Sequence, residues 1–149
     1  MRIYILLLSV LLMLTACYEK DPKSIKTSLV LKDNFSQESN IFTQGGSIEF
    51  YLTATNTTNN VVTLNFNSSQ QYDFYILNNS SYEIWRWSDD KLFAAALSGI
   101  SFQAGETKIF SVVWDQKLST GKNIQIGNYI AKGSLLNQSE LSNYNFKIQ

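Results

Sequence analysis

Alternation of apolar and polar residues with a period of two constrains this chain more than any other feature. It is cleanest at Ile48, Phe50, Leu52 and Ala54, which alternate with Glu49, Tyr51 and Thr53. Successive side chains of a β-strand point to opposite faces of a sheet, so this period predicts strands with one buried face. The same pattern predicts further strands near residues 28–32, 62–66, 72–76, 82–87, 110–114, 129–135 and 144–148.

The number and spacing of these segments predict the fold class. About eight short strands separated by polar turns are typical of an all-β domain, here an antiparallel immunoglobulin-like β-sandwich. Only residues 91–97 are predicted to be helical, over barely two turns. The domain is expected to span residues 25–149, preceded by a polar and charged tether over residues 17–24.

The N-terminus has the layout of a secretory signal peptide. Arg2 precedes a largely apolar run over residues 3–14, and small residues follow it. A stable transmembrane helix needs about 20 apolar residues, so this run is too short to be one. Residues 1–16 are therefore predicted to be a cleaved leader.

The end of this leader, Leu14-Thr15-Ala16-Cys17, resembles the lipobox of bacterial lipoproteins. Small residues fit a peptidase cleft, and the Cys17 thiol would accept a diacylglyceryl group whose acyl chains anchor the protein. Cys17 is the only cysteine, which favours lipidation over the alternative of an ordinary signal peptide with a chance cysteine. We expect export and lipid anchoring at the cell envelope. Tyr18 is not the Asp associated with inner-membrane retention, so the outer membrane is expected where two membranes exist, and otherwise the cell surface.

The composition argues against catalysis, cofactors and metals. The chain has no histidine, which excludes Ser-His-Asp and Cys-His sites and the usual Cys/His zinc sites. Asp73, Asp89, Asp90 and Asp115 have no spacing typical of a catalytic pair or a metal loop, and Asp89 with Asp90 is better interpreted as a turn. Twelve basic residues balance twelve acidic ones, so no nucleic-acid surface is expected. We predict no enzyme, and the oligomeric state stays open.

Residues 70–88, QQYDFYILNNSSYEIWRWS, carry the most specific motif of the chain. Its elements are Gln71-Tyr72-Asp73-Phe74 and Trp85-Arg86-Trp87-Ser88, followed by Phe93, Gly105-Glu106-Thr107, Trp114-Asp115 and Gly127-Asn128-Tyr129. In order and approximate spacing they resemble the BsuPI-type domain, named for an intracellular proteinase inhibitor of bacilli, over about residues 45–136. The resemblance implies an immunoglobulin-like sandwich and, by name, inhibition of a serine proteinase. The namesake acts inside the cell and this chain carries an export signal, so the proteinase target does not follow.

Two interpretations of the Trp-Arg-Trp motif are open. Trp85 and Trp87 are expected on one face of their strand, with Arg86 on the other. In the structural interpretation, both indoles fill the space between the sheets and Arg86 pairs with Asp73 on a neighbouring strand. In the functional interpretation, Arg86, Trp87 and Asp89 form a protein-binding patch, because Trp and Arg dominate interface hot spots.

Two function classes follow from these observations. The first is a membrane-anchored, non-catalytic lipoprotein whose sandwich binds another protein. The alternative is an inhibitor of a subtilisin-like serine proteinase at the envelope, with the long segments 88–104 and 115–128 as the expected contact. A purely structural accessory domain is a third, weaker hypothesis.

Overall fold

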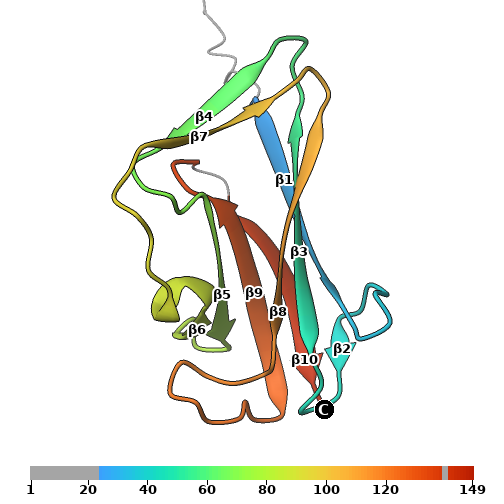
Figure 1. Cartoon of the computed structure of the whole chain (residues 1–149). Coiled ribbons are helices and arrows are strands. Elements are labelled where there is room, and N and C mark those ends of the chain that lie inside the picture. The colour runs from blue at the N-terminus through green and yellow to red at the C-terminus, as the bar shows by residue number, and fades with distance from the viewer. Residues whose placement is uncertain (1–23, 139–140) are drawn as a thin grey trace, which may run out of the picture.

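A computed structural model describes residues 24–138 and 141–149 (Figure 1). Its elements are β1 (Ile25–Lys32), β2 (Ile41–Phe42), β3 (Ile48–Asn56), β4 (Val62–Phe66), β5 (Tyr72–Asn78), β6 (Glu83–Arg86), the 3-10 helix η1 (Trp87–Asp90), β7 (Ser98–Phe102), β8 (Thr107–Trp114), β9 (Gly127–Leu135) and β10 (Ser142–Ile148). The predicted leader and Cys17 lie outside the described residues. Within the described ranges, no helix has the length and apolar character needed to cross a membrane.

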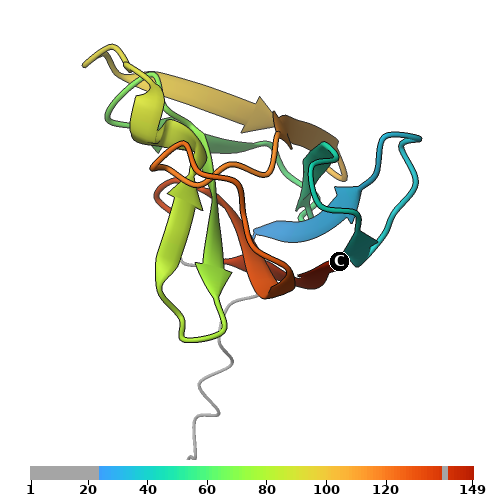
Figure 2. The same cartoon turned by 90° about the horizontal axis from the view of Figure 1, so that it is seen from below.

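Two larger sheets and a separate two-stranded sheet make up the domain (Figures 1 and 2). The strand order is β1-β3-β8 in one sheet and β2-β10-β9-β5-β6 in the other, while β4 pairs with β7. All pairs are antiparallel except the two-residue contact of β2 with β10, which is parallel. The all-β, sandwich-like fold is therefore confirmed, with about ten strands where the sequence predicted about eight.

The predicted alternation identifies the buried face of the central strand β3. Its apolar residues Ile48, Phe50, Leu52 and Ala54 are fully buried, whereas the residues between them are half-buried. Ile48, Phe50 and Leu52 share one core with side chains of both sheets, so the sheets pack face to face, whereas Ala54 belongs to a second core. Full burial of a side chain as large as those of Ile48, Phe50 and Leu52 contributes roughly 1.5–3 kcal/mol to stability.

The two-stranded β4–β7 sheet covers the end of the sandwich at which β1 begins (Figure 1). Leu64, Phe66 and Phe102 of this small sheet form a second core with Ile25 at the start of β1. The side-chain amide of the buried Asn56 donates to three carbonyls of this region, those of Asn60, Phe102 and Gln103. Buried polar groups need such partners, and these bonds fasten the β4–β7 sheet to the end of β3.

The helix predicted for residues 91–97 is wrong. This segment forms neither helix nor strand, and the single turn of 3-10 helix ends just before it, at Asp90. The Ser69 N–H donates to Ala94 O (2.9 Å), and the Ala94 N–H donates to Ser69 Oγ (2.8 Å). Because these backbone groups pair with a distant part of the chain, they cannot pair along a helix. The next residues form β7, a strand that the alternation pattern did not predict.

Candidate functional site

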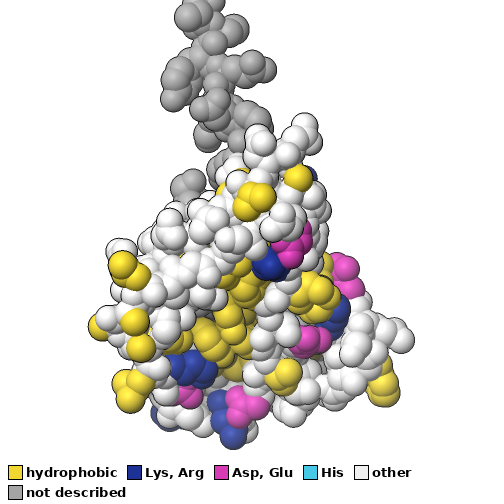
Figure 3. Space-filling model, turned by 45° about the horizontal axis from the view of Figure 1, so that its top comes forward, with side chains coloured by type: hydrophobic (Ala, Val, Ile, Leu, Met, Phe, Trp, Pro, Cys, Tyr) yellow, Lys and Arg dark blue, Asp and Glu magenta, His cyan; other side chains and the backbone are white. Residues whose placement is uncertain are grey.

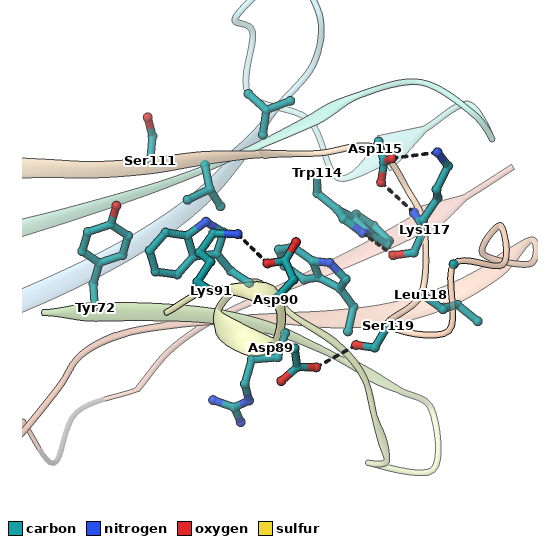
Figure 4. Close-up of a pocket in the computed structure, with 16 residues that line it drawn as sticks. Tyr72, Asp89, Asp90, Lys91, Ser111, Trp114, Asp115, Lys117, Leu118 and Ser119 are labelled. Atoms are coloured by element: carbon teal, nitrogen blue, oxygen red, sulfur yellow. Dashed lines mark hydrogen bonds and ion pairs between the residues drawn. The ribbon is translucent and has the colours of Figure 1, made fainter. Parts of the chain in front are cut away.

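A pocket of about 810 Å³ opens on one side of the sandwich, between the edge strands β6 and β8. One wall comes from β5, β6 and η1, and the other from β8 and the start of the loop that follows it. The face carrying it is hollowed, with hydrophobic side chains in the hollow and charged side chains along its margin (Figure 3). Figure 4 shows the lining residues. The site therefore combines an apolar interior with a charged margin.

Trp85 bridges the two sheets at the base of this pocket. Its ring centroid lies 5.5 Å from that of Phe50 and 5.5 Å from that of Trp114, both in the opposite sheet. Such aromatic pairs contribute about 0.5–1.5 kcal/mol each beyond the area they bury. For Trp85, the structural interpretation of the motif is confirmed.

Trp87 lines the pocket, but it lies in η1 and not in the strand predicted for it. β6 ends at Arg86, so Trp87 lies in η1 and stacks on Tyr72 with centroids 4.8 Å apart and planes at 20°. Phe93 packs against the same indole at 5.9 Å. The side chain remains half-buried at the open side of the sandwich. A large ring is therefore held in place and partly exposed.

Trp114 shapes the opposite wall. It is 2% exposed, and its indole N–H donates to the carbonyl of Lys117 (2.7 Å), which fixes the start of the loop after β8. Further along, the Ile124 N–H donates to the carbonyl of Gln116 (2.9 Å), and both residues are buried. This wall is thus fastened to the core by several bonds.

Arg86 is held on the other face of β5 and β6 by a network of charged groups. The carboxylate of Asp73, which is 3% exposed, accepts hydrogen bonds from Arg86 Nη1 (2.8 Å) and Ser88 Oγ (2.8 Å). Arg86 Nε also donates to Glu83 (2.9 Å), and the guanidinium lies 4.5 Å from the ring centroid of Tyr75. The hydrogen bond to Glu83, followed by that to Asp73, raises the pKa of Arg86 above its ordinary value. The predicted pairing of Arg86 with Asp73 is confirmed.

The margin of the pocket carries ionised groups with local partners (Figure 4). The hydrogen bond from Lys91 lowers the pKa of Asp90 below its ordinary value. In the described ranges, no cluster of three His, Cys, Asp or Glu side chains could hold a metal ion. The pairs at the margin are Asp89 with Ser119 (2.9 Å), Asp90 with Lys91 (2.6 Å) and Asp115 with Lys117 (3.1 Å).

The three residues proposed from sequence as a binding patch lie together in this structure. Arg86, Trp87 and Asp89 all line the pocket, although the guanidinium of Arg86 is occupied by its acidic partners. The Asp89–Ser119 hydrogen bond joins η1 to the loop after β8, which the sequence could not reveal.

Leu92 is fully exposed beside this site and was not predicted from the sequence. The available signal was an apolar run over residues 92–97 without the polar face that an amphipathic helix needs.

One protein family matches the sequence across most of the domain. The family is BsuPI, described as intracellular proteinase inhibitor, and the match spans residues 35–140. No curated protein matches significantly.

Several solved structures are similar at low sequence identity. A β-glucosidase from Erythrobacter marinus is similar with a TM-score of 0.50 and 9% identity over 85% of this chain. An alkylpurine DNA glycosylase from Pseudomonas fluorescens is similar with a TM-score of 0.49 and 12% identity over 85% of this chain. A CARDB domain from Pyrococcus furiosus has a TM-score of 0.44 and 10% identity, and the similarity covers 85% of this chain and 90% of that domain. This chain spans only 15% of the glucosidase and 30% of the glycosylase. The glucosidase similarity concerns the β-sandwich fold alone.

Proposed function

Because the chain belongs to the BsuPI family of intracellular proteinase inhibitors, we propose that it is a non-catalytic β-sandwich that binds and inhibits a subtilisin-like serine proteinase. The proposed place of action is the cell envelope, where a lipid on Cys17 would hold it. Family membership supports a proteinase as the partner, and the pocket between β6 and β8 supplies a surface for it.

The observation that carries this proposal is the make-up of that pocket. Trp85, Trp87 and Tyr72 present large, partly exposed rings, and residues of this kind dominate the binding free energy of protein interfaces. Their packing fixes them before a partner arrives, so little conformational entropy is lost on binding. Paired charges surround the rings, as in the polar rim of a protein–protein interface.

The test is inhibition by the full chain in detergent. We expect a subtilisin-like proteinase to lose its activity at a near-stoichiometric ratio. Trp87→Ala should raise the inhibition constant about tenfold or more, because the truncation removes an interface ring. Ile41→Ala, at an exposed apolar residue of β2, is the matched control and should leave inhibition unchanged. Degradation of the folded chain as an ordinary substrate would contradict the proposal.

The anchor is tested separately from the inhibition. The Leu14-Thr15-Ala16-Cys17 sequence supports acylation of Cys17. We expect radiolabelled palmitate to enter the protein in a bacterial host and to be absent from the Cys17→Ala variant. We also expect that variant to leave the membrane fraction, because the two or more acyl chains that make attachment durable are lost. Equal labelling of both proteins would exclude Cys17 as the acylated residue.

A further inference from the structure

Residues 91–97, apolar after Lys91, form a segment that the fold leaves exposed except at the half-buried Phe93. Leu92 and Leu97 are exposed large hydrophobic residues, and the three alanines at 94–96 are exposed as well. Exposed apolar residues that occur together, unlike those scattered singly, mark interaction sites. The segment follows η1 directly and therefore lies beside the pocket.

The backbone of this segment is held in place at several points. The Lys91 N–H donates to Ser88 O (3.1 Å), and Lys91 itself is extended, with φ −115° and ψ 148°. The reciprocal hydrogen bonds of Ala94 with Ser69 hold the other side. Phe93 packs on an indole of the pocket wall, and no residue of 91–97 has a positive φ.

Leu92 lies between these fixed points. Its neighbours Lys91 and Phe93 both contact Trp87, at 5.0 Å from Nζ to the ring centroid and 5.9 Å between ring centroids. Its own side chain is fully exposed. A bulky apolar side chain projects from a backbone that is already ordered, so little conformational entropy of the backbone would be lost when a partner binds it.

We infer that Leu92 is the side chain that enters the primary specificity pocket of the inhibited proteinase, with the main chain of Leu92 and Phe93 lying along the cleft between the two fixed ends of the segment. Extended segments bind through main-chain hydrogen bonds, while pockets for their side chains give specificity. An uncharged leucine fits a proteinase whose primary pocket is a hydrophobic slot, and does not fit one whose pocket carries a carboxylate. This inference rests on the proposed inhibition.

The experiment measures inhibition constants of the full chain against two serine proteinases, one with a hydrophobic primary pocket and one of trypsin-like preference. Leu92→Asp should raise the constant at least about 30-fold for the first enzyme, since loss of an interface hot spot has this size. Leu92→Lys should weaken inhibition of the first enzyme and create inhibition of the second. Val61→Asp changes an exposed valine just before β4 in the same way, and should stay within about threefold of the wild type.

The outcomes separate this inference from the proposed function. If the wild type inhibits and both Leu92 variants inhibit equally well, the role of Leu92 is overturned and the inhibition stands. If the wild type inhibits neither enzyme, both are overturned. If Leu92→Asp instead lowers binding of the Cys17→Ala chain to phosphatidylglycerol vesicles without changing inhibition, the segment is a lipid contact and the inference is wrong.

Discussion

Replacing Trp114 with alanine is expected to lower the free energy of unfolding by about 3–5 kcal/mol, the range found when large aromatic side chains are truncated in a core. The ring is almost completely buried and lies against Phe50, Trp85 and Phe146 from both sheets. Its removal leaves a cavity where the sheets meet. It also leaves the carbonyl of Lys117 without its indole donor, so the loop after β8 loses an anchor. Urea unfolding followed by circular dichroism measures the change.

Two companion variants identify the cause of this loss. Trp114→Phe keeps an aromatic ring in the core but removes the indole donor, so a smaller loss of about 1–3 kcal/mol is expected. Val113→Ala is the control, because this neighbouring residue of β8 is 68% exposed and should change stability by about 0.5 kcal/mol or less. A Trp114→Ala protein as stable as the control would show that this ring does not hold the sheets together.

The second large effect is expected from Arg86→Ala, through the buried carboxylate that it leaves behind. Asp73 would keep Ser88 as a side-chain donor but lose its cationic partner. Removing one member of a buried ion pair costs about 3–5 kcal/mol. The Arg86 side chain is 31% exposed, which weakens the pair by solvent screening, so we expect about 2–3 kcal/mol.

A double-mutant cycle in urea separates this pair from its surroundings. Asp73→Ala combined with Arg86→Ala should cost less than the sum of the two single changes, because the second change removes the unpaired charge. Glu83→Ala is the control, since its pair with Arg86 lies at the surface and is worth about 1 kcal/mol or less. Additive effects of Asp73→Ala and Arg86→Ala would refute the coupling.

The strands with a clear alternation were predictable from sequence, and the irregular segments were not. The buried face of β3 can be predicted from its sequence, because alternate residues of a pleated strand point to opposite faces of the sheet. β2 has two residues and therefore no period to detect. β7 contains Gly99, which is unfavourable in a strand, and its pairing with β4 depends on register across the whole intervening chain.

In the candidate site, only the contacts between oppositely charged residues on adjacent strands could be predicted from the sequence. Asp73 and Arg86 lie on adjacent strands with opposite charges, so their pairing could be proposed. The stacking of Trp87 on Tyr72 requires the chain to leave the strand at Arg86 and turn. The pocket itself requires two strand edges far apart in sequence, and the exposure of Leu92 depends on the hydrogen bonds between Ala94 and Ser69.

The direction of the strands has a consequence for where the domain could act. Ile25 pairs with Asn56 at one end of β3, whereas Trp114 of the pocket wall pairs with Ile48 at the other end. The length of β8 separates these ends by roughly 24 Å. A lipid on Cys17 would be linked to Ile25 by a tether whose fully extended length is at most about 29 Å. Together these two lengths would allow the pocket to reach up to roughly 50 Å from the bilayer surface. A proteinase held in the same layer would meet the domain at a raised local concentration. The proposed anchor would therefore favour inhibition of proteinases at the membrane surface over inhibition of proteinases in solution.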